Sequence, residues 1–208
     1  FIDWCMLRCT EMKLREPVNY LRGEWIRPED LSLYEEMGYD LFKVTERDLP
    51  TAVMVDRVRA YAARRYDGNL LDLVQPYALK GVDGSDRYYK KGIGWYLRFL
   101  LRPLLVNPAR MLVLKKVVDL RRMTRPVEGT PPVYIDNRAL DGFMERFREA
   151  GCRDQDCDAC RWCHTFAEKA VRVDEAMRAE ALAAYEELFR SLDGGDMWRY
   201  FSGAGAGR

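Results

Sequence analysis

The sequence predicts an α/β protein, with a βα-repeat in its first third and a mainly helical, cysteine-rich remainder. Helix, strand and helix patterns follow one another with short connections between residues 28 and 68, which is typical of a βα-repeat. The last third combines helical periodicity with a dense run of cysteines. The chain has 208 residues, of which 48% are hydrophobic, so it can bury a core without disulfides.

The first third contains the predicted βα-repeat. Phe1–Trp4 is predicted to end a strand and to deliver Cys5 to a loop. A helix should begin at Pro28, a residue suited to the first helical turn, and end at Gly38. β-Branched and aromatic residues then predict a short strand over 39–44.

A second helix should begin at Pro50 and end near Asp67. Its apolar positions, which recur at helical spacing, are Val53, Val55, Val58, Tyr61 and Ala62. Ligand sites of parallel barrels lie at the carboxyl ends of strands. The loop over 45–48 is therefore expected on the functional face.

The middle of the chain is basic and is predicted to form a helical hairpin, with arms over 95–106 and from Asn107 to about Leu120. It is either a core hairpin with a solvated basic face or a surface for RNA or membrane. A strand over 131–136 and a helix over 140–150 should follow. The final helix should run from His164 to about Leu192.

We expect four segments along the chain. They are a closing βα section over 1–77, the basic hairpin over 78–130, a cysteine-rich helical region over 131–201, and a disordered tail over 202–208.

Charge is dense but nearly balanced, with 34 basic and 33 acidic side chains, so net charge does not argue for a nucleic-acid partner. No stretch reaches the roughly 20 uncharged apolar residues of a membrane span. Six cysteines without a secretory leader predict a reducing, cytoplasmic location.

The cysteines are the strongest functional signal, and they fall into two groups. One group is Cys5 and Cys9, and the other is Cys152, Cys157, Cys160 and Cys163. The last three follow C-x2-C-x2-C spacing, which lets neighbouring soft thiolates converge on one metal centre and favours an iron–sulfur cluster. Disulfides are disfavoured, because residues three apart rarely satisfy disulfide geometry.

Zinc is the alternative metal, but it usually needs two C-x2-C pairs or histidine. The only histidine, His164, is adjacent to Cys163, and its ring is expected to point away from a shared site. Four ligands are expected from the six cysteines: Cys157, Cys160 and Cys163 first, and then Cys152, Cys5 or Cys9. The last two either complete this cluster or form half of a second site.

Lys43 and Arg47 flank the end of the strand predicted over 39–44. In a barrel mouth they would bind an anionic or polar substrate, and otherwise they would form surface ion pairs with Glu46 or Asp48. No catalytic residue is identified, because the chain has no recognisable nucleophile–base pair and no glycine-rich phosphate loop.

Several motifs together resemble the closing section of the collagenase-like peptidase family, class U-thirty-two. They are Cys5-x3-Cys9, Trp25-Ile-Arg-Pro-Glu-Asp30, Gly38-Tyr-Asp-Leu-Phe-Lys43-Val-Thr-Glu-Arg47 and Val58-Arg-Ala-Tyr61. Lys43 and Arg47 align with the family's lysine and arginine. Thr45 and Glu46 stand where the family has glutamate and glycine, so the family's active-site glutamate does not transfer directly.

The resemblance implies the C-terminal part of a TIM-like (β/α) barrel and a 4Fe–4S cluster bound by four cysteines. The remaining barrel strands would come from residues outside this sequence or from a partner chain. It also implies an electron donor and oxygen-independent hydroxylation of an aromatic, quinone-like or nucleobase substrate, which could be a small molecule or RNA. The alternatives are a peptidase or other hydrolase, and a structural-zinc module that binds RNA.

Overall fold

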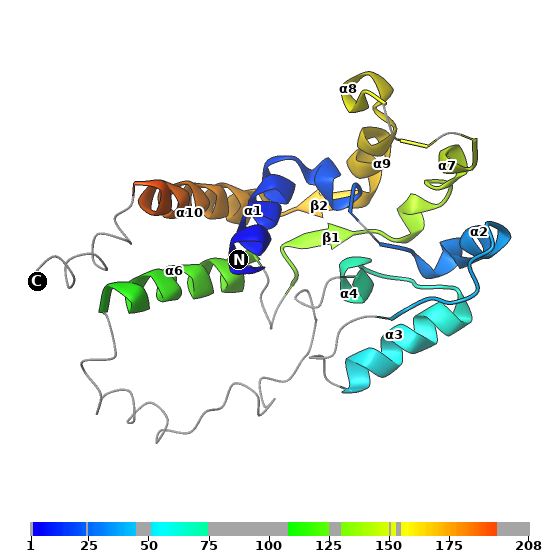
Figure 1. Ribbon diagram of the computed structural model, residues 1–208, viewed down its shortest axis with the longest axis horizontal. Coiled ribbons are helices and arrows are strands. Elements are labelled where there is room, and N and C mark those ends of the chain that lie inside the picture. Colours follow the sequence, from blue (N-terminus) through cyan, green and yellow to red (C-terminus); the bar gives the residue numbers. More distant parts are fainter. Residues whose placement is uncertain are drawn as a thin grey trace, which may run out of the picture.

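The computed structural model describes residues 2–23, 25–44, 51–74, 108–124, 130–149, 151–152 and 155–194. Over these residues the protein is mainly helical, with helices arranged around a two-stranded sheet (Figure 1). The elements are α1 (Ile2–Arg15), η1 (Pro17–Tyr20), η2 (Pro28–Asp30), α2 (Leu31–Glu36), α3 (Thr51–Ala63), α4 (Leu71–Val74), α6 (Pro108–Thr124), β1 (Val133–Ile135), η4 (Arg138–Leu140), α7 (Glu145–Glu149), α8 (Cys157–Cys160), α9 (Trp162–Ala170), β2 (Val171–Val173) and α10 (Glu175–Asp193).

The sheet lies at the centre of the described chain. β1 pairs antiparallel with β2, and Val133 lies opposite Val173. On the other edge of β1, the buried Asn69 side chain donates to the Val133 carbonyl at 3.1 Å and accepts from the Ile135 amide at 2.9 Å. Asn69 therefore satisfies backbone groups that a third strand would otherwise bind.

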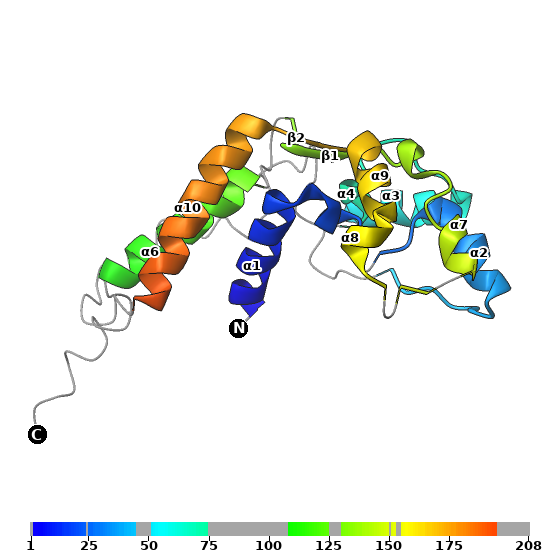
Figure 2. The same cartoon turned by 90° about the horizontal axis from the view of Figure 1, so that it is seen from above.

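The longest described helix, α10, packs against two other long helices. α10 lies beside α6 and also contacts α1, as both views show (Figure 1, Figure 2). Tyr185 and Leu188 of α10 are almost fully buried, together with Leu14 of α1. At the rim, Lys116 of α6 and Glu187 of α10 form an ion pair at 2.6 Å.

A buried arginine ties the amino-terminal segment to the chain that follows β1. Arg27 is 2% exposed, and its guanidinium makes two bonds of 2.8 Å to the carboxylate of Asp30. It also donates to the Asn137 carbonyl at 2.8 Å and to Asp141 at 3.1 Å. Burial opposes the charged form of Arg27, but these acceptors outweigh it and raise the pKa of the guanidinium.

The strand predicted at Phe1–Trp4 is wrong, because α1 covers this region from Ile2 onward. Leu7 and Leu14, two turns apart, bury one helical face. On the same helix Glu11, with a side chain 4% exposed, accepts from Arg8 and Arg15, each at 2.7 Å. These i, i+3 and i, i+4 pairs stabilise a helix and have no counterpart in a strand.

The helix predicted from Pro28 to Gly38 is confirmed as η2 followed by α2. Gly38 has φ +93°, a left-handed conformation that favours glycine after a helix end. The strand predicted over 39–44 is wrong, since these residues form no ladder with the described chain. Leu41 is 93% exposed, as expected of an extended segment with no partner on either side.

The helix predicted after Pro50 is confirmed as α3, but its buried face differs from the prediction. Val55 and Val58 are exposed, whereas Arg57 and Ala60 are buried. Arg57 donates twice to the Asp72 carbonyl, at 3.0 and 3.1 Å, and so anchors α3 to α4.

Later in the chain, the helix from residue 108 and the strand within 131–136 are confirmed as α6 and β1. The helix predicted over 140–150 begins later, as the short α7 at Glu145. The single final helix is wrong, because β2 separates α9 from α10. Asp174 caps the start of α10: its side chain accepts from the Met177 amide at 2.9 Å, and this bond separates the helix from β2.

The (β/α) barrel and the four predicted segments stay predictions. The loop over 45–48 with Arg47, the first arm of the basic hairpin and the tail over 202–208 lie outside the described residues. None of the helices that the structure describes combines the length and apolar character needed to cross a membrane.

Candidate metal centre

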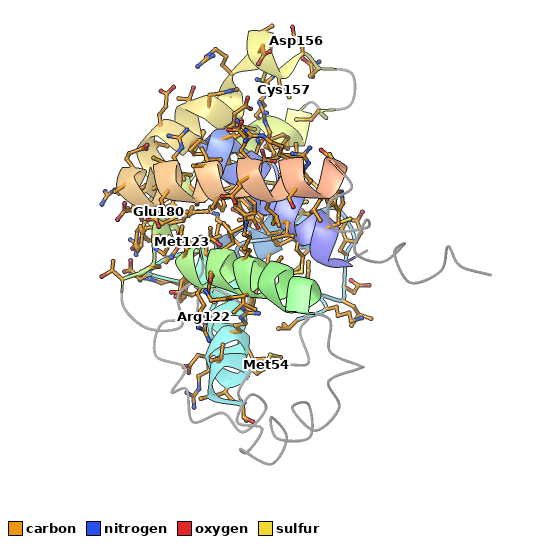
Figure 3. All side chains as sticks on the ribbon, turned by 90° about the vertical axis from the view of Figure 1, so that its left-hand side faces the viewer. Met54, Arg122, Met123, Asp156, Cys157 and Glu180 are labelled. Carbon is orange, nitrogen blue, oxygen red and sulfur yellow. The ribbon has the colours of Figure 1, made fainter. Side chains whose placement is uncertain are left out.

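Four cysteines that the sequence predicts as metal ligands line one pocket, here called the four-cysteine pocket. Its empty space is about 320 Å³, including the part open to solvent. Its lining residues are Arg22, Arg146, Phe147, Cys152, Gln155, Cys157, Cys160, Trp162, Cys163 and His164. Figure 3 shows Asp156 and Cys157 at one end of the molecule, with Met54 of α3 at the opposite end.

A single helical turn, α8, places Cys157 and Cys160 on one face. Residues three apart in a helix lie side by side, and the Cys160 amide bonds the Asp156 carbonyl at 2.9 Å. The Asp156 side chain caps the turn by accepting from the Asp158 amide at 2.9 Å. One aspartate of the cysteine run therefore has a structural role.

Cys163 reaches the same pocket because the chain turns sharply at Arg161. This residue has φ +51°, a left-handed conformation that costs a non-glycine residue about 1–2 kcal/mol. It ends α8 and begins α9, which carries Cys163 in its first turn. The strained residue thus lies between two predicted ligands, where strain is often tied to function.

The thiols are close enough to affect one another electrostatically. Burial raises the pKa of the Cys163 thiol, and the thiols of Cys152, Cys157 and Cys160 raise it further. Arg22 acts in the opposite direction and lowers that pKa. Without a cation the site therefore disfavours ionised Cys163, and a bound metal would reverse this preference.

Aromatic side chains lie beside the four-cysteine pocket. The Trp162 indole donates to the Phe143 carbonyl at 3.0 Å, and its ring centroid lies 5.0 Å from that of Phe166. Phe147 of α7 lines the pocket directly. These contacts join the cysteine run to the core.

The sequence predicts that the His164 ring points away from the thiols, and the structure places this residue in the lining of their pocket. His164 lines the four-cysteine pocket, and its buried Nδ1 has no hydrogen-bond partner among the described residues. Buried polar atoms are nearly always satisfied, so this nitrogen lacks a partner that such a position normally has. Its position keeps a mixed cysteine–histidine zinc site among the alternatives.

The residue types in the pocket fit a thiolate-bound metal, but their side chains are not arranged around one common point. No three Cys, His, Asp or Glu side chains of the described chain are close enough to hold an ion in their present positions. The shared pocket and the effect of the other thiols on the pKa of Cys163 show that the four cysteines lie near one another. Proximity is a weaker condition than coordination of one ion. Coordination would require the thiols to turn toward a common centre.

The other predicted site residues lie elsewhere. Cys5 and Cys9 are exposed on α1, four residues apart, and neither lines the four-cysteine pocket. Lys43 is exposed, and Arg47 lies outside the described residues, so the substrate mouth stays a prediction.

Sequence reasoning missed Arg22 and Arg146 as pocket residues. Arg22 comes from the loop after η1 and Arg146 from α7, so neither lies within the cysteine run. No spacing rule connects a distant arginine to a thiol group, and only the fold brings the three segments together.

An uncharacterized protease of Methanocaldococcus jannaschii is 24% identical to this chain over 172 residues. The match covers 82% of the chain and 36% of the relative, so it spans about a third of the relative's length. No protein-family model and no solved structure matched the chain. The similarity agrees with the resemblance to collagenase-like peptidases and supports, at most, a relationship to that family.

Proposed function

We propose that this chain is the cysteine-rich part of a U-thirty-two-like protein and that Cys152, Cys157, Cys160 and Cys163 bind an iron–sulfur cluster. The observation that carries the proposal is the shared pocket, since four thiols from α8, α9 and the preceding loop line it together. Four thiolates are the usual ligand set of a 4Fe–4S cluster.

The residues around the thiols suit a cluster. Trp162 and Phe147 bring apolar surface to the site, which limits water and tunes cluster chemistry. Cys163 lies in the first turn of α9, where the positive end of the helix dipole favours negative charge on sulfur. A bound cluster would supply electron transfer, and the protein residues would hold it and control access to it.

The wider activity follows from the family resemblance. We propose oxygen-independent hydroxylation, or a related redox modification, of an aromatic, quinone-like or nucleobase substrate, with Lys43 and Arg47 at the substrate mouth and a separate electron donor. Because the chain matches about a third of its relative, the substrate-binding barrel would include residues outside this sequence. A cytoplasmic location is part of the same proposal.

A peptidase is the second candidate, and the printed name of the relative favours it. Cleavage of peptide substrates by metal-free protein would support this activity. Cleavage that only the metal-containing protein performs, and that a chelator abolishes, would instead connect the activity to a bound metal.

The first experiment is purification without oxygen, followed by absorbance and by analysis of iron, sulfide and zinc. We expect brown protein with about four irons per chain. Colourless protein with one zinc would overturn the iron–sulfur assignment and the redox activity, while leaving a metal centre. Protein without either metal, including after reconstitution with iron and sulfide, would overturn the metal centre itself.

A further inference from the structure

Two arginines from different parts of the fold face the four-cysteine pocket. Arg22 lies in the loop after η1, and its Nη1 donates to the Asn19 side chain at 3.3 Å. Arg146 lies half-buried on α7, a few residues before the cysteine run. Both arginines line the same pocket as the four cysteines.

The charges of these arginines are not neutralised by described carboxylates. Neither Arg22 nor Arg146 forms an ion pair with an acidic side chain of the described chain, whereas several nearby arginines do. Arg148, also on α7, pairs with Glu36 at 3.1 Å, and Arg161 pairs with Glu168 at 3.8 Å. The pocket therefore holds two arginines without a described carboxylate partner beside the four cysteines.

The two positive charges of Arg22 and Arg146 equal the net negative charge expected of a metal centre bound by four thiolates. Four thiolates around a divalent ion, or around a 4Fe–4S core with two positive charges, leave two negative charges. A partly buried net charge is costly unless opposite charge lies near it. Two guanidinium groups supply that charge, and their several N–H donors suit diffuse sulfur acceptors.

We propose that Arg22 and Arg146 form the counter-charge of the metal centre and set how tightly the four-cysteine pocket binds metal. The inference rests on the proposed function, because it assumes that the thiols bind a metal. It assigns a role to residues outside the cysteine run and makes the loop after η1 and α7 part of the centre. Neither arginine is a ligand; each acts on the centre through its charge.

The test is anaerobic titration with Co²⁺ alone, which enters thiolate sites and gives a visible sulfur-to-metal absorption band. Arg22→Gln and Arg146→Gln should each weaken Co²⁺ binding by about tenfold, corresponding to about 1.4 kcal/mol per charge. Arg22→Lys and Arg146→Lys should bind within about threefold of the parent protein, because they retain the charge. Arg148→Gln is the matched control and should bind as the parent does.

The outcomes separate this inference from the proposed function. If the parent protein binds no Co²⁺ at the thiols and takes up no iron and sulfide on reconstitution, the metal centre itself is wrong. If the parent binds Co²⁺ and the glutamine variants bind equally well, only the counter-charge is wrong. Circular dichroism without metal checks that Arg146→Gln still folds. If it does not fold, the test rests on Co²⁺ binding by the glutamine and lysine variants of Arg22, because Arg22 is exposed and these changes leave the core unchanged. Equal losses in both of those variants would overturn the charge-based role.

Discussion

Replacing Cys160 with serine should lower the metal content of protein prepared without oxygen by more than about tenfold. Even the outer partners of metal ligands change affinity by about 10–100-fold when removed, so losing a ligand should cost more. Cys160 lies at the end of α8 and lines the pocket with the other three thiols. Iron, sulfide and zinc per chain are the quantities to measure.

Asp158→Asn is the matched control, because Asp158 lies in the same helical turn and carries no thiol. It should retain the metal content of the parent protein. If Cys160→Ser keeps its metal, Cys160 is not a ligand and the four-cysteine assignment is wrong. If Asp158→Asn loses metal as strongly, a carboxylate belongs to the site.

Replacing Arg27 with methionine should lower the free energy of unfolding by about 3–5 kcal/mol. The change leaves Asp30, whose side chain is 12% exposed, without its partner, and breaking a buried pair from one side costs this much. It also removes the bond from Arg27 to the Asn137 carbonyl, which ties the segment before α2 to the chain after β1. Urea denaturation followed by circular dichroism measures the effect.

Arg59→Met provides the comparison for Arg27. Arg59 pairs with Asp56 at 3.2 Å, but both side chains are more than 70% exposed, and such pairs contribute about 0–1 kcal/mol. The variant should therefore unfold within about 0.5 kcal/mol of the parent. Equal effects of the two substitutions would show that the Arg27 network does not hold these segments together.

Local sequence signals correctly predicted those elements whose ends carry residues with restricted or unusual backbone conformations. Pro28 and Gly38 bound one helix correctly, because proline and glycine restrict the backbone independently of the rest of the chain. The strand β1 was predicted within 131–136, and its Val133 and Ile135 are buried, as alternate residues on one face of a half-buried strand are.

The errors arose where distant contacts decide the structure. Residues 39–44 have the composition of a strand, but a strand also needs a hydrogen-bonding neighbour, which composition does not reveal. The three residues of β2 lie inside an Ala- and Glu-rich run, and only their pairing with β1 distinguishes them from helix. Similarly, α3 buries Arg57 because the Asp72 carbonyl is there to accept from it.

In the candidate site too, local spacing predicted some features, whereas contacts between distant segments decided the others. The spacing of Cys157, Cys160 and Cys163 predicted their proximity, since helix geometry and a short connection control it. Spacing could not decide between Cys152 and the pair on α1, because that choice depends on how remote segments pack. It likewise could not place His164 or the two arginines at the pocket.

The most direct test of the central claim is the metal content of a chain in which Cys5 and Cys9 are both replaced with serine. Both residues are exposed on α1 and neither lines the four-cysteine pocket, so the substitutions should leave the fold intact. Reconstituted without oxygen, this chain retains only Cys152, Cys157, Cys160 and Cys163. We predict the same iron and sulfide content as the parent protein, and loss of the metal would contradict the claim that these four thiols form one complete centre.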